Sequence, residues 1–181
     1  LLGPQEISPD GPARLTDGRA AHVLRVLKAG PGDRLRVGVI DGPVGAATIL
    51  AAGAGQVDLR CEFGAVPPRP AVDLLLALPR PKVLRRLWAQ LAALGVGRIV
   101  LTNAARVERN YFDTHVLAEP AYRPLLIEGL QQARDTRLPR VLVCRRLKVF
   151  VEDELDSLAP AGPRLVAHPG SHPSIPDALR A

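Results

Sequence analysis

The sequence of 181 residues contains no methionine, and phenylalanine, tyrosine and tryptophan together make up 3% of it. So few aromatic rings argue against a platform that stacks the bases of single-stranded nucleic acid. Cys61 and Cys144 form no CxxC spacing and the four histidines are dispersed, so the sequence predicts neither a disulfide framework nor a metal site. Without an initiator methionine, we expect an N-terminus that is processed or incomplete.

Long hydrophobic runs are also missing. No apolar stretch approaches the roughly 18 residues that cross a bilayer, and the first residues, LLGPQEISPDG, lack the basic and apolar regions of a signal peptide. We therefore expect a soluble cytoplasmic protein with no membrane partner. Hydrophobic residues make up 47% of the chain and charged residues 23%, which predicts a folded core in one domain or two small ones.

Positive charge is in excess, with 24 Lys and Arg against 18 Asp and Glu and a net charge of +6. Lysine occurs only at positions 28, 82 and 148, so most of the cations are arginines, whose planar guanidinium suits phosphate groups. A genome rich in arginine codons could account for that preference, but it does not explain why much of the excess lies between Arg80 and Lys148. The distribution predicts an anionic partner.

The first domain is predicted to end at the segment VPPRP, residues 66–70, because three prolines interrupt a helix or a central strand. Short apolar runs precede it at 21–27, 34–40, 46–50 and 56–63. Turn signals separate these runs: AGPGD, Asp41-Gly42 and the glycines at 53 and 55. Strands of this length and spacing are typical of a small β-barrel, which we assign to residues 1–68.

Strands and helices alternate after the prolines. The apolar patterns predict strands at 72–78, 98–102, 140–144 and 164–168, and helices at 82–94, about 121–134 and 148–158. The near-continuous apolar run 72–78 is typical of a strand that is buried on both faces. We expect residues 69–181 to form an α/β domain with a mostly parallel sheet, incomplete where the alternation stops at Ala181. The predicted fold class is α/β plus a small β-barrel.

Three motifs are weak candidates for a site. A phosphate-binding glycine loop would follow the first strand of the α/β domain. The segment LPRPK stands there instead and contains no glycine, which argues against a nucleotide-binding loop. Ser171, His172 and Asp177 could form a triad, but they lie in a loop without a nucleophile elbow. The acidic run at 152–156 fits a solvated face near a helix start better than a metal site.

A constellation of basic residues is the strongest candidate. One group lies in the predicted barrel, and three others follow the first and second strands of the α/β domain or end its second helix. The groups are His22, Arg25, Lys28, Arg34 and Arg36; Arg80, Lys82, Arg85 and Arg86; Arg106 and Arg109; and Gln132, Arg134 and Arg137. Open α/β sheets bind ligands at the carboxyl ends of their strands, so we expect the last three groups at one edge, facing one anionic ligand. Scattered, solvated charges are the alternative.

The order of several short motifs resembles the 16S rRNA uridine-N3 methyltransferases of the RsmE type. HVLRVLKAGPGDRLRVGVIDG (22–42) is similar to the family's H-x-x-x-V-L-R, G-D and D-G, with Lys28 at the final arginine of the first motif. Residues 76–101 are similar to the family's first α/β unit, which runs into E-L-G-V. Arg106 matches an arginine after the second strand, Gln132 and Pro139 match E-Q-S-G-R…P, and LVAHPG (165–170) matches a strand ending in His-Pro.

The resemblance implies a PUA-like barrel that grips rRNA, a SPOUT methyltransferase domain with a deep trefoil knot, a homodimer, and S-adenosylmethionine as cofactor. The implied reaction methylates N3 of a uridine in the 16S rRNA of the small ribosomal subunit. It assigns the target nucleotide to Arg106, Gln132 and Arg134, and cofactor contacts to Ala167, His168 and Pro169. RNA contacts are assigned to His22, Arg25, Lys28, Arg34, Arg36, Arg80, Lys82, Arg85 and Arg86.

Two departures from the family pattern bear on this interpretation. Arg134-Asp135 replaces the family's Gly-Arg pair, and the signatures G-P-E-G-G and L-R-T-E-T-A, which belong to the knot and the cofactor pocket, do not occur. We therefore expect the 181-residue chain to be inactive by itself. A non-catalytic RNA-binding protein made of the same two modules is the main alternative, and an α/β enzyme acting on a small phosphorylated substrate is another.

Overall fold

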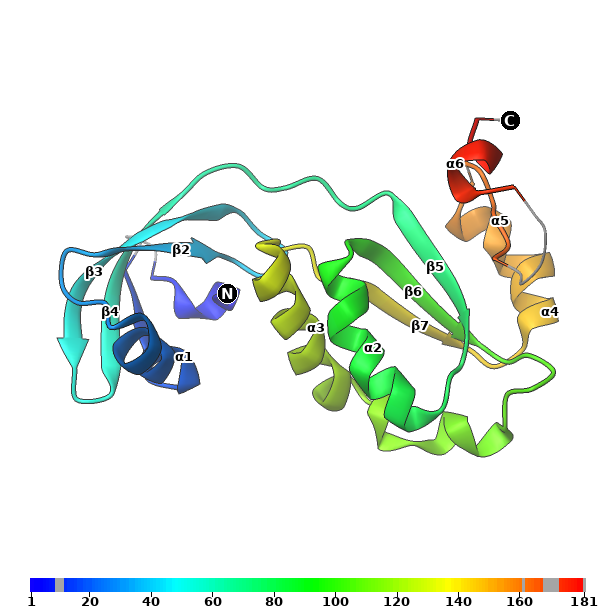
Figure 1. The fold of residues 1–181 in the computed structure, drawn as a ribbon, viewed down its shortest axis with the longest axis horizontal. Coiled ribbons are helices and arrows are strands. Elements are labelled where there is room, and N and C mark those ends of the chain that lie inside the picture. Colours follow the sequence, from blue (N-terminus) through cyan, green and yellow to red (C-terminus); the bar gives the residue numbers. More distant parts are fainter. Residues whose placement is uncertain (9–11, 161, 168–172, 181) are drawn as a thin grey trace. The chain divides into compact units, whose positions relative to one another are not determined.

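The structure is a computed structural model that describes residues 1–8, 12–160, 162–167 and 173–180. The chain divides into two compact units, Leu1–Arg145 and Arg146–Ala181. The first unit holds an antiparallel sheet and a parallel sheet (Figure 1).

Four strands build the antiparallel sheet: β1 (Pro12–Leu15), β2 (Arg34–Gly38), β3 (Val44–Gly53) and β4 (Gln56–Phe63), in the order β1-β4-β3-β2. Both predicted hairpin turns are confirmed, because Asp41 and Gly55 take positive φ angles of 58° and 80° between the paired strands. Alternate residues of β4 are buried, as the period of two requires. An antiparallel sheet in this region agrees with the prediction, and its closure into a barrel stays a prediction.

Residues 21–27 were expected to form a strand, and this prediction is wrong. They belong to α1 (Gly18–His22) and to a π-helix, Val23–Leu27, that continues it. The Asp17 side chain caps α1 by accepting a hydrogen bond of 2.9 Å from the Arg19 backbone N–H, and Lys28 ends the π-helix in the left-handed region. The apolar residues at 20 and 23 face the core of the antiparallel sheet, so tertiary packing and the cap outweigh the strand-like local pattern.

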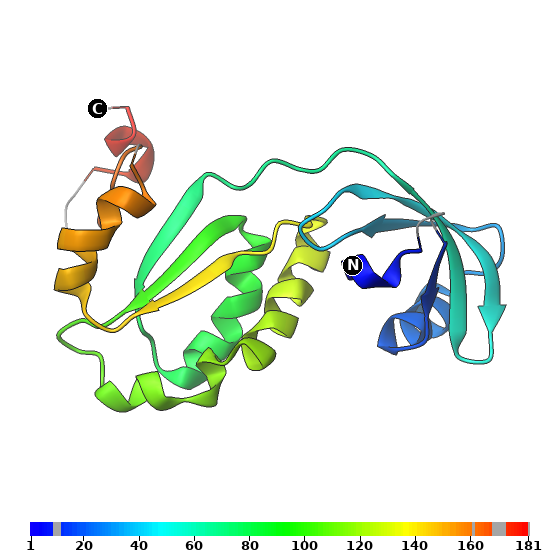
Figure 2. The ribbon, with the colours of Figure 1, turned by 180° about the vertical axis from the view of Figure 1, so that it is seen from behind.

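The parallel sheet consists of β5 (Val72–Ala77), β6 (Val96–Thr102) and β7 (Arg140–Cys144), in sequence order. The helices α2 (Pro81–Ala93) and α3 (Glu119–Ala133) connect these strands, and short 3-10 turns at Arg109–Asp113 and His115–Leu117 precede α3. Both helices lie on the same face of the sheet, and Figure 2 shows the sheet from the opposite face. The predicted parallel α/β arrangement is confirmed for these elements.

The core of the α/β region lies between the sheet and the two helices. This core includes Leu84 and Trp88 of α2 and Ile99 and Leu101 of β6, all of them buried. Gly129 lets α3 approach α2 closely, because a Cβ atom there would lie 2.1 Å from the backbone oxygen of Ala89. On the apolar period predicted for α2, Leu84 and Leu91 are buried, whereas Leu94 at its end is 79% exposed.

The expectation that residues 72–78 are buried on both faces is wrong. Val72 is 63% exposed and Leu75 is 40% exposed. Among the described strands β5 pairs with β6 alone, and α2 and α3 cover one face of the sheet. An apolar run therefore predicted the strand correctly but not its place at an edge.

The regular elements that the structure describes in the second unit are all helical. The segments α4 (Leu147–Val149), a π-helix (Phe150–Glu154) and α5 (Leu155–Leu158) follow one another, which confirms the predicted helix, and α6 spans Ile175–Ala178. The predicted strand 164–168 is not found at Arg164–Ala167, and His168 lies outside the described residues. Val166 is 90% exposed. No described strand lies beside this apolar run, so its backbone groups have no partner strand for hydrogen bonds. None of the described helices is long and apolar enough to cross a membrane.

Candidate nucleic-acid interface

The loop between α3 and β7 docks on the turn between β2 and β3. Thr136 is fully buried, and its hydroxyl donates a hydrogen bond of 2.7 Å to the carbonyl oxygen of Gly42. The Asp41 N–H donates to the Thr136 carbonyl oxygen at 2.7 Å, and the Asp41 carboxylate accepts from the Leu138 N–H at 3.3 Å. The Asp41-Gly42 motif therefore provides both a left-handed turn and the docking point for this loop.

Arg137 belongs to this joint rather than to a ligand site. Its Nε donates to the Pro67 carbonyl oxygen at 2.6 Å, and its Nη1 donates to the Asp41 carbonyl oxygen at 3.1 Å. The guanidinium thus ties the proline-rich segment and the hairpin turn to the start of β7.

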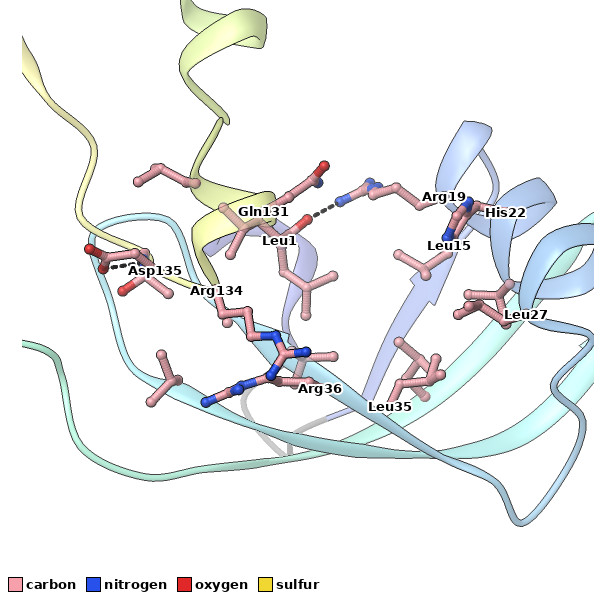
Figure 3. A pocket seen from close by; sticks show the side chains of 18 of the residues that line it. Leu1, Leu15, Arg19, His22, Leu27, Leu35, Arg36, Gln131, Arg134 and Asp135 are labelled. Carbon is pink, nitrogen blue, oxygen red and sulfur yellow. Dashed lines mark hydrogen bonds between the residues drawn. The ribbon is translucent and has the colours of Figure 1, made fainter. Parts of the chain in front are cut away.

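A cavity of about 800 Å³ lies next to this joint (Figure 3). It is bounded by α1 and the π-helix, by β2 and β4, and by the end of α3. Three residues from the predicted basic groups line it together: His22, Arg36 and Arg134. Arg134 caps α3 in the left-handed region, with a φ of 59°.

The sequence reasoning missed several polar residues of the cavity, among them Arg19 and Gln131. The guanidinium of Arg19 donates to Glu6 and to Asp17, and its Nη1 donates to the Leu1 carbonyl oxygen at 2.7 Å. Hydrogen bonds with Glu6 and Asp17 raise the pKa of Arg19, and Arg19 in turn lowers the pKa of Glu6 and of Asp17. Arg19 is therefore charge-compensated within the protein. The Asp17 cap was the available signal that α1 begins here.

The remaining basic residues of the first group lie on the surface near the cavity. Arg25 and Lys28 are exposed at the π-helix, and no ion pair joins either of them to another described residue. Arg34 approaches Glu62 at 3.6 Å, with both side chains exposed. The free cations of the π-helix are better placed for phosphate groups than Arg34 is.

The basic groups of the α/β region do not share one edge, so that expectation is wrong. The carboxyl edge of the sheet holds two of the groups. Exposed on the first half of α2, or just before it, are Arg80, Lys82, Arg85 and Arg86. At the same edge, Arg106 follows β6. The helix α3 returns the chain to the start of β7, so its C-terminal residues Gln132 and Arg134 lie at the amino edge. Gln132 is exposed and does not line the cavity, whereas its neighbour Gln131 does.

Arg106 is exposed in the loop after β6 and pairs with no acidic group among the described residues. Its neighbour Glu108 instead accepts a hydrogen bond of 2.9 Å from the Tyr111 hydroxyl. A guanidinium without an acidic partner at the carboxyl edge is available to an external anion or carbonyl oxygen.

One of the three residues assigned to cofactor contacts lies in the described part of the chain. Ala167 is exposed, and His168 and Pro169 lie outside the described residues. At the carboxyl end of β6, Thr102 is 2% exposed, and its hydroxyl oxygen has no hydrogen-bond partner among the described residues. The described part of the chain contains no cluster of three or more His, Cys, Asp or Glu side chains that could hold a metal ion.

Comparison with known proteins finds similar sequences and similar folds. The profile of the RNA methyltransferase domain family matches residues 67–181. The ribosomal RNA small subunit methyltransferase E of Treponema pallidum (strain Nichols) is 32% identical over 139 residues, which are 74% of this chain and 51% of that protein. The chain spans about half the length of the curated relatives it matches.

Two solved structures share the fold. A putative methyltransferase from Legionella pneumophila, in complex with the bound cofactor SAM, superposes with a TM-score of 0.63 at 20% identity, over 95% of this chain and 71% of that chain. A ribosomal RNA small subunit methyltransferase E from Neisseria gonorrhoeae, bound to S-adenosyl methionine, superposes with a TM-score of 0.58 at 15% identity, over 78% of this chain and 60% of that chain.

Proposed function

Since the chain belongs to the RNA methyltransferase domain family, we propose that the protein methylates N3 of a uridine in the 16S rRNA of the small ribosomal subunit. The relatives named ribosomal RNA small subunit methyltransferase E support an rRNA substrate. The structural observation that carries the proposal is Arg106, an exposed guanidinium beyond the carboxyl end of β6 that pairs with no acidic group among the described residues.

The reaction needs hydrogen-bond donors beside the uracil ring. The N3–H group is a weak acid: when its proton passes to solvent, negative charge spreads from N3 to the two flanking carbonyl oxygens, and N3 can then bond to the methyl carbon as the carbon–sulfur bond of the donor breaks. We assign the stabilisation of that charge to Arg106. Because Gln132 and Arg134 lie at the amino edge of the sheet, we assign them to parts of the RNA away from the reacting base.

S-adenosylmethionine, when bound, supplies an electrophilic methyl group on its sulfonium. The two solved relatives that hold it support this donor. The buried hydroxyl of Thr102, at the carboxyl end of β6, fits such a ligand, because no described residue offers it a hydrogen bond. Ala167, His168 and Pro169 keep the cofactor contacts that the resemblance implies.

The antiparallel sheet and its helical segment are the proposed rRNA grip. Within residues 1–68, a PUA-like domain, Arg25, Lys28 and Arg36 would hold the RNA backbone, with a smaller contribution from Arg34, and His22 would be a further RNA contact. Arg80, Lys82, Arg85 and Arg86 extend this basic surface along α2 of a SPOUT-type domain, residues 69–181. We also propose that the protein acts as a cytoplasmic homodimer.

The test uses the full-length product of the gene, small ribosomal subunits and methyl-labelled S-adenosylmethionine. Nucleoside analysis of the 16S rRNA by mass spectrometry should show N3-methyluridine. Methylation at a different atom, or none, would refute the proposal. The 181-residue chain assayed alongside should bind rRNA without methylating it.

A non-catalytic RNA-binding protein is the second candidate. The cationic cavity favours it, because this cavity lies at the amino edge of the parallel sheet, away from Arg106. This alternative predicts that the full-length protein binds rRNA but leaves every uridine unmodified.

A further inference from the structure

The cavity beside the α3–β7 loop has no role in the proposed methyl transfer. It lies at the opposite edge of the parallel sheet from Arg106, between the antiparallel sheet and the C-terminal end of α3. Its volume of about 800 Å³ falls within the range of about 300–1,000 Å³ that is usual for small-molecule sites.

The mouth of the cavity carries uncompensated positive charge. Figure 3 shows the side chains of Arg36, from β2, and Arg134, from the end of α3, reaching toward the same place. No acidic group pairs with either of them among the described residues. Two neighbouring guanidinium groups repel each other unless an anion lies between them, and their planar forks suit a phosphate group.

The other charged groups of the cavity do not cancel this charge. Arg19 is compensated by Glu6 and Asp17. The Asp135 carboxylate accepts the backbone N–H groups of Thr136 and Arg137, at 2.6 and 3.1 Å, so it faces its own loop. The cavity therefore selects an anion.

The floor of the cavity is apolar. Leu15, Val23, Leu35, Val37, Leu59 and Leu130 line it. His22 offers an imidazole plane at the rim, and Gln131 offers an amide that can both donate and accept hydrogen bonds. An inorganic anion would leave this apolar floor unused, whereas a ligand with a flat ring and a phosphate would use both parts.

We propose that the cavity binds one nucleotide of the RNA substrate, turned out of its stack, with its base on the apolar floor and its phosphates on Arg36 and Arg134. Proteins that read single-stranded RNA commonly stack splayed-out bases on aromatic rings, His or guanidinium planes. Here the imidazole of His22 and the aliphatic side chains take that place. The inference rests on the proposed RNA substrate, but not on the site or chemistry of methyl transfer.

The experiment measures nucleotide binding to the full-length protein through a tryptophan placed at the mouth. Leu27 lines the cavity and is 51% exposed, so Leu27→Trp adds a reporter without overfilling the core, and the native Trp88 is fully buried elsewhere. The probes are a 5′-phosphorylated uridine tetranucleotide, the same tetranucleotide with abasic sites, and inorganic phosphate.

Matched variants then test the two arginines. Arg36→Gln removes the charge but keeps a polar side chain of similar stem, and Arg134→Gly suits the left-handed cap of α3 better than the native residue does. Each should weaken tetranucleotide binding about tenfold, as expected for the loss of one charge-assisted hydrogen bond. Arg60→Gln is the control, because Arg60 is exposed on β4 and does not line the cavity.

We expect the tetranucleotide to quench the fluorescence of the reporter tryptophan. The abasic oligomer and inorganic phosphate should quench it much less. Equal binding of the abasic oligomer would overturn the inference and leave a plain backbone site. A reporter that is already shielded from iodide and does not respond to any probe would show that protein fills the cavity, which also overturns it.

The methylation assay separates this inference from the proposed function. If the wild-type protein produces N3-methyluridine while Arg36→Gln and Arg134→Gly bind the tetranucleotide normally, the inference fails and the function stands. If no uridine is methylated but the tetranucleotide still binds through both arginines and its base, the function fails and the nucleotide site stands.

Discussion

The hydroxyl of Thr136 donates to the carbonyl oxygen of Gly42 at 2.7 Å, which links two turns that lie 94 residues apart in the sequence. The return bond, from the Asp41 N–H to the Thr136 carbonyl oxygen, closes the joint at 2.7 Å. Arg134 lies two residues before Thr136 and Arg36 lies on the strand that leads to the turn. The joint therefore determines whether these two arginines face the same cavity.

Thr136→Val should destabilise the protein, because it removes the donor while keeping nearly the same shape. The partly buried Gly42 carbonyl oxygen would lose its partner, at a cost of about 1 kcal/mol in the free energy of unfolding. Urea unfolding followed by circular dichroism measures this. Thr48→Val on β3 is the control, since no side-chain hydrogen bond joins Thr48 to another described residue, and it should change the midpoint little.

Gly38→Ala should also weaken the joint, through a steric clash rather than a lost bond. A Cβ atom at Gly38 would lie 2.5 Å from Thr136 Cγ2, and the hydrogen bond to Gly42 prevents the threonine from turning away. We expect a loss of about 1–3 kcal/mol. Thr136→Ser keeps the hydroxyl and removes Cγ2, so Gly38→Ala should cost clearly less in that background. If Gly38→Ala cost as much unfolding free energy in the Thr136→Ser background as in the wild-type protein, a clash with Thr136 Cγ2 would be ruled out.

Local patterns in the sequence predicted the α/β region well because those elements have strong local signals. The helix α2 has apolar residues at helical spacing, a proline at its first position and Gly95, with a φ of 74°, just after its end. The segment 21–27 failed for the opposite reason: its strand-like composition is overruled by a cap at Asp17 and by burial of Val23.

The cavity could not be predicted in this way, because it depends on pairings between distant segments. Nothing near Arg134 in the sequence indicates that its loop docks on Asp41-Gly42, and nothing near Arg19 indicates that Glu6 pairs with it. The basic residues themselves were visible. Which of them are free, and which are used to hold the fold together, as Arg137 is, required the structure.

The ion pair of Glu6 predicts a loss of stability in acid. Hydrogen bonds from Arg19 lower the pKa of Glu6 in the folded protein below its value of about 4.3 in an unfolded chain. The stabilisation is therefore complete above that unfolded value and is lost as the pH falls through the lower, folded value. Urea unfolding between about pH 3 and pH 6 should show this decline, and Glu6→Gln should flatten it. Glu62→Gln, at an exposed ion pair, should retain the wild-type slope.

Arg25 and Lys28 should bind RNA through phosphate groups, since both are exposed without ion pairs among the described residues. Replacing both with Ala should weaken rRNA binding and lower the slope of log affinity against log salt by about one unit per lost contact. Arg14→Ala is the matched control, because Arg14 already donates to Asp58 at 2.6 Å. An unchanged salt slope in the Arg25 and Lys28 variant would show that these side chains are solvated surface charges that do not contact the RNA.

Arg106 should matter for turnover rather than for cofactor binding. Its guanidinium lies beyond the carboxyl end of β6, and Glu108, the nearest acid in sequence on that loop, bonds to Tyr111 instead. If Arg106 stabilises charge on the uracil carbonyl oxygens, Arg106→Ala should lower kcat about a hundredfold, as the loss of one well-placed donor does. Single-turnover methylation of small subunits by the full-length protein measures the rate, and calorimetry with S-adenosylmethionine measures cofactor affinity, which should hardly change. Arg106→Lys should recover little activity, because an ammonium group cannot make a planar, bidentate contact. Should Arg106→Ala instead lower the unfolding midpoint and leave the rate per folded molecule intact, the arginine would be structural and this assignment would be wrong.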